Sequence, residues 1–394
     1  MDRGASFWDS LFTATSAVCV TGLMLHDTAQ YWSYFGQFVI MILIQIGGMG
    51  VVTVSIAIAM LSGRKIGLMQ RSTMCEAISA HHVGGIVRMT GFILRTTIII
   101  ELTGAAAMFP VFCRDFGAVK GLWYSLFHAV SAFCNAGFDL LGVRSEFSSL
   151  TTYADNPVIN ITIMTLIVTG GIGFLTWDDI KTHKIHLKKY RMQSKVILTV
   201  TSLLILLPAL YFYFVEFSAD KWSGMSVSER ILGSFFQSVT PRTAGFNTVD
   251  LTMLSEAGVF IMIILMITGG SPGSTAGGIK TTTIAVLFSS AFSVFRRKGE
   301  TNCFHRRISD DTINHAATIL LMYLVLFLTG GIAISCMEGI PILDCLFETA
   351  SAIGTVGLTL GITTALGFAS RLILIVLMFW GRVGGLPLVF AAIS

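Results

Sequence analysis

The sequence predicts an all-α polytopic membrane protein built from four repeated units, and three observations support this fold class. Of the 394 residues, 54% are hydrophobic and only 12% are charged, far below the charged fraction of about 25% that is typical of soluble domains. Apolar stretches of about twenty residues, the length that crosses the hydrocarbon layer of a bilayer, recur along the whole chain. One short segment that contains a glycine occurs four times between these stretches.

Seven apolar stretches are predicted to form spanning helices. They are residues 34–61, 89–110, 157–177, 195–217, 256–294, 313–337 and 370–394. The basic linkers between them are predicted to be cytoplasmic, because Lys and Arg in short loops set membrane orientation. These linkers are residues 62–95, 181–195 and 296–307. Flanking a membrane explains the linkers better than binding a nucleic acid does, so no nucleic-acid partner is expected.

The cysteines and histidines do not indicate a resident metal or cofactor. The seven cysteines include no CxxC pair, which argues against a disulfide or zinc framework. His183 and His186 are close in sequence, but they lie among lysines that would repel a metal cation. We therefore expect no cofactor, and a solvated loop at the two histidines.

The recurring segment has one frame in all four copies, at residues 9–23, 124–138, 233–246 and 344–358. In each copy an aromatic residue stands ten positions before a glycine, and an apolar residue follows the glycine. The pairs are Phe12 and Gly22, Phe127 and Gly137, Phe235 and Gly245, and Phe347 and Gly357. Ten helical residues rise only about 15 Å, so each copy is predicted to be a half-spanning helix followed by a short extended tip.

Non-helical backbone is tolerated at membrane depth only where protein buries it or where it lines a water-filled cavity. Four tips around one axis would do both and would enclose a central ion pore. Rings of main-chain carbonyls can replace the water around a cation, and glycine accepts the positive φ that such a ring requires. Re-entrant hairpins whose glycines serve only close helix packing are the alternative. The predicted filter residues are Val20, Thr21, Gly22, Asn135, Ala136, Gly137, Thr243, Ala244, Gly245, Thr355, Val356 and Gly357.

A glycine-rich run, TGGSPGSTAGGIK at residues 268–280, interrupts the apolar stretch 256–294. Its glycines and proline cannot hold a helix together. A phosphate-binding loop of the form GxxxxGK[ST] requires glycine before the lysine, but Ile279 stands there. A nucleotide-hydrolysing enzyme is therefore disfavoured, and a helix break that only aids packing remains an alternative.

One arginine lies in the last apolar stretch. A buried arginine at membrane depth costs about 3 kcal/mol on insertion scales, so Arg382 is a functional candidate, with snorkelling to the cytoplasmic surface as the alternative. Glu101 and Lys280 are weaker candidates, because a helix-facing ion pair or an interfacial position explains either. Cys19 and Cys134 stand just before their tips and are expected to pack behind the filter.

These motifs resemble the Trk/Ktr/HKT superfamily of potassium transporters, and within it the pore-forming subunit of the KtrB type. The resemblance rests on VCVTGL, CNAGF, RTAGF and TVGLT in order, and on SPGSTAGGIKTTT, GGIGF and GRVGGLPL. It implies four helix-loop-helix units around one pore, potassium uptake across the bacterial plasma membrane, and no enzymatic activity. It also implies that glycine at the first tip, Gly22, goes with potassium preference.

The resemblance further assigns a gate and partners. The implied gate consists of Gly269, Gly270, Ser271, Pro272, Gly273, Ser274, Thr275, Ala276, Gly277, Gly278, Lys280 and the pore arginine Arg382. The implied assembly is a homodimer in the lipid membrane, docked on a cytosolic ring of nucleotide-binding KtrA-type regulatory subunits. An influence of sodium on transport is left open.

The predicted units are residues 1–63, 64–194, 195–308 and 309–394. The first differs from the others because the chain opens directly into its pore segment, without an outer helix. We therefore expect a truncated form of the family's chain. The alternative function is a non-transporting remnant or scaffold.

Overall fold

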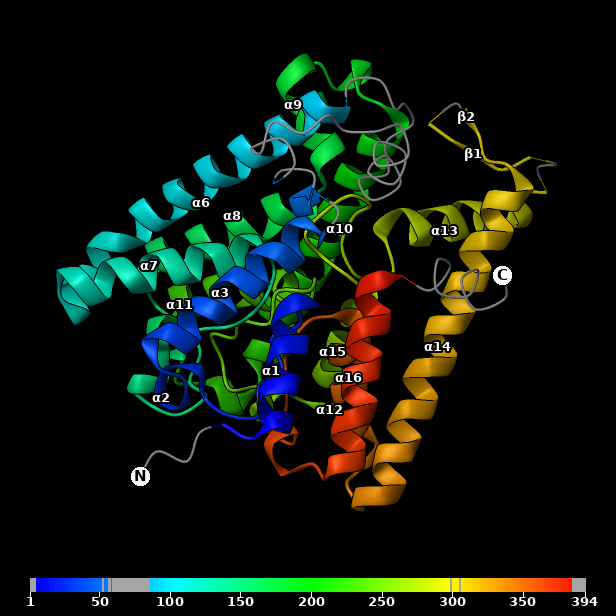
Figure 1. Ribbon diagram of the computed structural model, residues 1–394. Helices are drawn as coiled ribbons and strands as arrows, with labels where there is room; N and C mark the ends of the chain where they lie inside the picture. Colours follow the sequence, from blue (N-terminus) through cyan, green and yellow to red (C-terminus); the bar gives the residue numbers. More distant parts are fainter. Residues whose placement is uncertain are drawn as a thin grey trace.

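The computed structural model describes residues 5–51, 53–55, 58, 86–297, 300–304 and 306–384. The chain in these ranges is largely helical, with one small antiparallel hairpin of β1 (Asn302–Cys303) and β2 (Arg306–Arg307). Figure 1 shows the two longest helices, Ile86–Phe116 and Asp310–Glu338, on opposite sides of the molecule. The boundary predicted at residue 63 and most of the linker 62–95 lie outside the described residues.

Four groups of helices follow one another along the chain. The first has α1 (Phe7–Val18), α2 (Thr28–Tyr31) and α3 (Tyr34–Met49). The second has α6 (Ile86–Phe116), α7 (Ala118–Phe133), α8 (Pro157–Gly171) and α9 (Phe174–His183). The third has α10 (Met192–Phe214), α11 (Val227–Val239), α12 (Glu256–Ile267) and α13 (Thr281–Phe295). The fourth has α14 (Asp310–Glu338), α15 (Ile342–Gly354) and α16 (Phe368–Val383).

Single 3₁₀ turns connect these helices. They are η1 (Leu141–Val143), η2 (Thr151–Tyr153), η3 (Leu187–Lys189), η4 (Glu216–Ser218), η5 (Asp220–Trp222), η6 (Leu251–Met253) and η7 (Thr363–Ala365). We call α1, α7, α11 and α15 the tip helices. Each is followed by a three-residue segment that we call its tip, at residues 20–22, 135–137, 243–245 and 355–357. The outer helices are α6, α10 and α14, and the inner helices are α3, α8, α12 and α16.

Local sequence explains where several helices begin and end. Ser226 and Glu229 form a reciprocal capping box at the start of α11. Asn156 caps α8, with Pro157 at its first turn. The long helix α14 ends at Gly339, whose φ of 69° is the left-handed conformation that glycine adopts without strain. Polar caps at the starts of α8 and α11 and a glycine at the end of α14 thus set these helix ends.

The outer helices are the continuous spans of the described chain. Residues Arg88–Phe116, Met192–Ser218 and Asp310–Glu338 are each long and apolar enough to cross a membrane. Their outward faces expose leucines such as Leu102, Leu207 and Leu321. Extended apolar surface of this kind marks contact with lipid or another protein.

The inner helices are shorter than predicted. The stretch 157–177 is not one helix, because the chain bends by 99° between α8 and α9. The stretches 34–61 and 370–394 contain α3 and α16, which end at Met49 and Val383. After Gly50 the described residues 51, 53–55 and 58 are again helical, whereas residues 385–394 lie outside the described part. In each case a glycine with positive φ follows the end of the helix.

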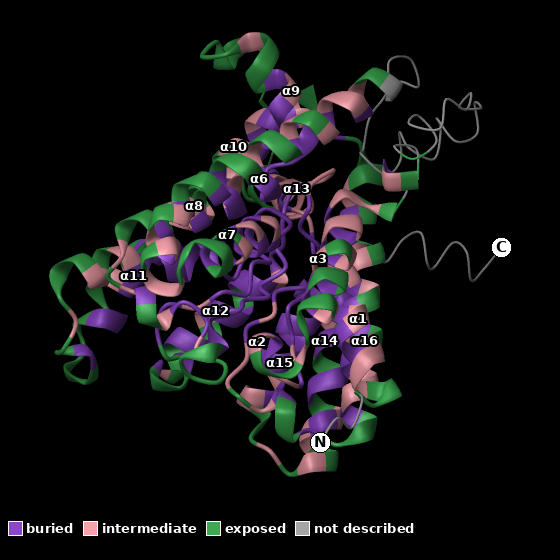
Figure 2. Cartoon of the chain, turned by 60° about the vertical axis from the view of Figure 1, so that its left-hand side comes forward, coloured by how far each residue is buried: buried purple, intermediate pink, exposed green. Residues whose placement is uncertain are grey.

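The buried interior consists of two apolar clusters that meet around the tips. One lies mainly in the first and second groups, with Ile44 and Phe127, and extends to Phe236 of the third group. The other lies mainly in the third and fourth groups, with Met262 and Phe347, and extends to Phe12 of the first group. In Figure 2 the chain at the centre is buried, whereas exposed residues lie on the outer helices and at the ends. The core therefore surrounds the segments that the sequence singles out.

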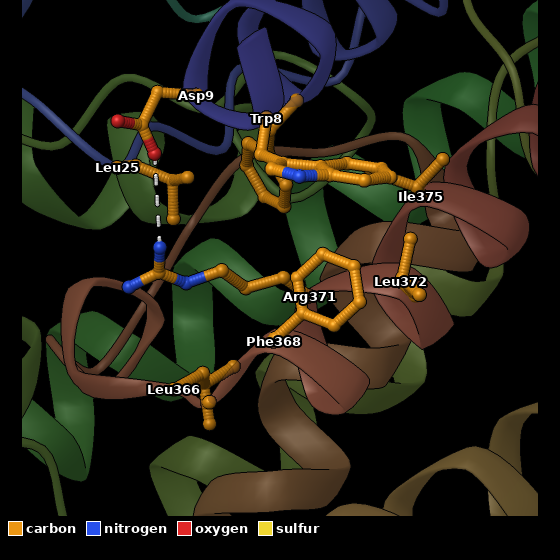
Figure 3. A pocket seen from close by; sticks show the side chains of 10 residues that line it. Trp8, Asp9, Leu25, Leu366, Phe368, Arg371, Leu372 and Ile375 are labelled. Carbon is orange, nitrogen blue, oxygen red and sulfur yellow. Dashed lines mark ion pairs between the residues drawn. The ribbon is translucent and has the colours of Figure 1, made fainter. Parts of the chain in front are cut away.

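The first group differs from the others in its surroundings. Outer helices precede α7, α11 and α15 directly, but no outer helix precedes α1 in the described residues. A crevice of about 220 Å³ lies between α1 and α16, lined mainly by apolar residues such as Trp8 and Phe368 (Figure 3). An ion pair between Asp9 and Arg371, with a nitrogen to oxygen distance of 3.7 Å, closes one side.

Two predicted basic linkers lie at one end of the molecule. Residues 181–195, after α9, and the β1–β2 hairpin in 296–307 both lie at the top of Figure 1, while α2 lies at the opposite end. This placement agrees with a common side of the membrane for these two linkers, which is the arrangement that the positive-inside rule requires.

Candidate ion pathway

The four tips form a closed ring. A Cβ atom built on the glycine of each tip would strike the main-chain oxygen of the residue before the next glycine. The pairs are Gly22 with Ala136, Gly137 with Ala244, Gly245 with Val356, and Gly357 with Thr21. The last pair returns to the first tip, so the tips surround one axis in chain order. The close approach leaves room for glycine alone at these positions.

The four tips share one backbone conformation. Their glycines have positive φ, at 91°, 69°, 81° and 91° along the chain. The first tip residues, Val20, Asn135, Thr243 and Thr355, also have positive φ, between 52° and 66°. A non-glycine residue in this region costs on the order of 1–3 kcal/mol and persists only where its surroundings hold it. The same strained conformation at four equivalent positions indicates a functional constraint on the backbone.

Hydrogen bonds from the tip helices hold this conformation. The N–H groups of the middle residues Thr21, Ala136, Ala244 and Val356 donate to carbonyls of their own tip helices, at 2.7–2.9 Å. Ser16 and Ser351 accept from the N–H groups of Gly22 and Gly357, each at 3.0 Å. Ser131 donates to the carbonyl of Phe138 at 2.7 Å. Sequence reasoning missed these hydroxyls, although a serine six residues before the glycine in three copies was a usable signal.

The third copy departs from the predicted frame. Phe235, ten positions before Gly245, is 39% exposed, whereas Phe236 is fully buried like the phenylalanines of the other three copies. Thr240 also takes the place of Ser131, because its hydroxyl donates to the carbonyl of Phe246. The third copy is therefore one residue shorter between helix and glycine, and assigning Phe235 to the common frame was wrong.

The inner helices end directly below the tips in a repeated way. Three of them finish in a four-residue run that begins and ends with glycine, at residues 47–50, 170–173 and 381–384. The last glycines, Gly50, Gly173 and Gly384, have φ values of 83°, 90° and 81°. The first glycines pack on carbonyl oxygens four residues before the tip glycine, those of Val18, Phe133 and Ile353. Inner helix and tip are thus locked together within each unit.

The glycine-rich run 268–280 lies against these helix ends. Ser271 N–H donates to Gly171 O at 3.0 Å, and Gly278 N–H donates to Gly381 O at 3.2 Å. A Cβ built on Gly277 would strike the side chain of Thr355 in the fourth tip. The run therefore replaces the continuation of α12 with a loop that contacts the second and fourth units beneath the ring.

Thr275 is at the centre of this loop. It is fully buried, and its N–H donates to Gly170 O at 3.2 Å. Its hydroxyl donates to Phe133 O at 3.0 Å and lies 3.5 Å from Asn135 Oδ1 of the second tip. Asn135 in turn donates through Nδ2 to Thr243 Oγ1 at 3.2 Å. Side-chain contacts therefore run from the loop to two tips.

Arg382 reaches the loop from α16. Its guanidinium donates to the carbonyls of Thr275 and Gly47, and to that of Gly48 at 3.2 Å. The arginine thus joins the first, third and fourth units below the ring, with its guanidinium turned toward the loop. Within the repeated run, Arg382 occupies the second position, where the other two runs have glycine.

The remaining candidates lie apart from the axis or have local roles. The Lys280 ammonium donates to Ala276 O of its own loop at 2.8 Å. Glu101 is buried on α6 and lies 4.0 Å from Cys134 Sγ, behind the second tip. Cys19 and Cys134 are both buried next to their tips. Lys280 therefore bonds within the run 268–280, and the rest of that run contacts the ends of neighbouring inner helices.

Comparison with known proteins identifies the family. The TrkH family, described as cation transport protein, matches residues 3–394. The chain belongs to this family. It is therefore a membrane ion transporter and not an enzyme, which confirms both the resemblance and the predicted all-helical fold class.

Individual relatives agree with this assignment. The chain is 40% identical over 389 residues to the potassium/sodium uptake protein NtpJ of Enterococcus hirae, covering 98% of this chain and 85% of that protein. It is 39% identical to the Ktr system potassium uptake protein B of Bacillus subtilis, covering 98% and 86%. The crystal structure of the potassium transporter TrkH from Vibrio parahaemolyticus matches with a TM-score of 0.75 at 20% identity, over 98% of this chain and 78% of that one.

Proposed function

We propose that this protein takes up potassium ions through the ring of the four tips, which acts as a selectivity filter. The closed ring, in which every glycine faces a main-chain oxygen of the next tip, carries this proposal. Such a ring offers uncharged oxygens to a cation that has lost its water. The names of the relatives, which include a potassium/sodium uptake protein and two potassium uptake proteins, support the choice of ion.

The charge in the ring comes from dipoles. All four tip helices end at their tips, so their carboxyl-terminal ends face the ring and carry partial negative charge. No tip residue is ionisable. A site made of dipoles attracts a monovalent cation but binds it weakly enough to release it, which conduction requires.

The loop 268–280 and Arg382 form the gate in this proposal. The loop lies below the ring and is held there by its contacts with Gly171, Gly381 and Arg382. A fixed positive charge at this place repels cations that leave the ring. Displacement of the loop would break the bond between Arg382 and Thr275 and would open the way to the cytoplasm.

The proposal includes the setting of the transporter. It places a homodimer in the bacterial plasma membrane, with the linkers 181–195 and 296–307 in the cytoplasm, where they contact a nucleotide-binding KtrA-type regulatory subunit. The basic charge of these linkers and their position at one end of the molecule support this orientation. Division of the chain into four units at residues 63, 194 and 308 belongs to the same proposal, as does an influence of sodium.

Uptake of K⁺ and Na⁺ into cells that lack their own potassium uptake tests the ring. Gly22→Ser should weaken the preference for K⁺, because a Cβ at Gly22 meets the carbonyl of Ala136 and the φ of 91° disfavours serine. Gly91→Ala is the matched control, since a Cβ on this helical glycine meets no atom within 4 Å. An unchanged preference in Gly22→Ser would contradict the filter, and no uptake by the unaltered chain would favour a non-transporting remnant.

A further inference from the structure

A polar residue follows the buried phenylalanine in every tip helix. These residues are Thr13, His128, Gln237 and Glu348, which we call the collar. Thr13 is 5% exposed and the other three are fully buried. Burial of a polar group is unfavourable unless a hydrogen bond compensates for it. A polar residue at the same buried position in four helices therefore calls for an explanation beyond packing.

In the second unit, the collar residue ties the tip helix to the chain that leaves the ring. His128 Nδ1 lies 2.7 Å from Tyr124 O, and Leu140 N–H donates to His128 Nε2 at 3.4 Å. Because Nε2 accepts, Nδ1 carries the proton and donates to the carbonyl. Leu140 stands three residues after Gly137, so the imidazole holds the outward end of the second tip.

The fourth unit has a second tie of the same kind. Thr363 donates its hydroxyl proton to Glu348 Oε1. The hydroxyls of Thr363 and Thr359 lie 3.0 Å apart, and Gly361 N–H donates to Thr359 Oγ1 at 2.9 Å. Thr359 stands two residues after Gly357. The carboxyl group of Glu348 therefore anchors residues 359–363, the segment that leads outward from the fourth tip.

The third unit provides an internal contrast. Neither amide atom of Gln237 has a hydrogen-bond partner in the described part of the chain. The collar residue is as deeply buried here as in the second and fourth units, but it holds no exit segment. Removal of its polar atoms breaks no bond of the ring.

We propose that Glu348 is a positioning residue that sets the potassium preference of the ring, with His128 doing the same in the second unit. The inference rests on the proposed function of the ring as a potassium filter. Each tip is fixed at its start by its tip helix, and in the second and fourth units the collar residue also fixes the outward end. Loss of the outer anchor lets the carbonyl oxygens move inward around the smaller Na⁺, which reduces the discrimination between the two ions.

Parallel uptake of K⁺ and Na⁺ by three variants tests this role. Glu348→Met keeps the length of the side chain but removes the acceptor, so the ratio of K⁺ to Na⁺ uptake should fall about fivefold, the size expected for the loss of one hydrogen bond. Glu348→Gln keeps an acceptor oxygen and should stay close to the unaltered ratio. Gln237→Met is the matched control at the same position of the third tip helix, and its ratio should not change.

A second substitution reaches the same bond from the other side. If Glu348→Met does not reach the membrane, Thr363→Val removes the donor instead and should lower the ratio by a similar factor. In the double variant the two losses should not add, because both remove one interaction. An unchanged ratio in Glu348→Met and Thr363→Val, while Gly22→Ser still changes it, would overturn the role of Glu348 and leave the ring as filter. If Gly22→Ser leaves the ratio unchanged as well, the proposed function itself fails.

Discussion

The four units are alike in the ring of tips, but they differ from one another in the layer directly below it. In the ring, all four units adopt the same backbone, and each contributes a glycine with positive φ and a carbonyl to its neighbour. In the layer below, three units end their inner helices alike, whereas the third inserts the loop 268–280. The fourth unit places Arg382 where the first and second units have Gly48 and Gly171.

The difference indicates which atoms would perform each task in the proposed function. The ring uses main-chain oxygens, so its side chains vary between units while the glycines stay. The layer below uses individual side chains, and one arginine on one unit contacts two of the other three. In the proposed function, coordination of K⁺ follows the fourfold repeat, and control of flux depends on the departure of the lower layer from that repeat. Substitutions in the two layers should accordingly have effects of opposite sign.

The largest expected effect is a loss of uptake from the ring. Gly245→Ala places a Cβ against Val356 O and 3.1 Å from the Cα of Gly137, at a φ of 81°. The left-handed conformation alone costs alanine about 1–2 kcal/mol, so the rate of K⁺ uptake should fall more than tenfold. Gly91→Ala, in open space on α6, should leave the rate unchanged. Equal uptake by both variants would show that the ring does not carry the ion.

The layer below should respond in the opposite direction. Arg382→Gln removes the charge and its bonds to Thr275 and Gly47, so K⁺ flux should rise by up to about tenfold, as expected when a barrier of about 1.4 kcal/mol is removed. Arg371→Gln, on the same helix but in the crevice at the α1–α16 contact, should leave the flux unchanged. Flux measured at equal amounts of protein in the membrane decides this. A lower flux in Arg382→Gln would contradict the gate.

The smallest effect is expected far from both layers, at Asp9. Partial burial raises the pKa of Asp9, but hydrogen bonds with Ser6 and His26 and the charges of His26 and Arg371 outweigh it, so the pKa lies below its ordinary 3.8. A lowered pKa stabilises the fold above that value, and the stabilisation is lost as the pH falls through the folded-state pKa. Asp9→Asn should reduce stability at pH 7 by less than about 1 kcal/mol.

Thermal unfolding in detergent measures the effect of Asp9→Asn. The difference from the unaltered protein should shrink when the pH is lowered below 3.8, and K⁺ uptake should stay the same. Glu146→Gln, an exposed acid in the outer loop, serves as the control. A loss of uptake in Asp9→Asn would place part of the pathway outside the two central layers.

Much of this architecture could be predicted from the sequence, because glycine spacing encodes the backbone directly. Gly22, Gly137, Gly245 and Gly357 occur in one frame, and the structure brings them into one ring. The exposed Phe235 shows the limit of a fixed frame, since a one-residue deletion in the third copy shifts its aromatic to Phe236.

Contacts between distant residues could not be predicted in the same way. The bonds from Arg382 to Thr275 and Gly47 join three units that are far apart in sequence. The tie between Glu348 and Thr363 depends on how the exit segment folds back over its tip helix. The bend between α8 and α9 was missed because apolar length alone does not show that Gly173 adopts a φ of 90°.

The position of a heavy monovalent cation tests the central claim most directly. Rb⁺ or Tl⁺ substitutes for K⁺ and is located by its anomalous scattering in crystals of the protein. The account predicts a peak on the axis enclosed by the four tips, at carbonyl distance from the residues that precede and include the glycines. A peak elsewhere, with none between the tips, would contradict it.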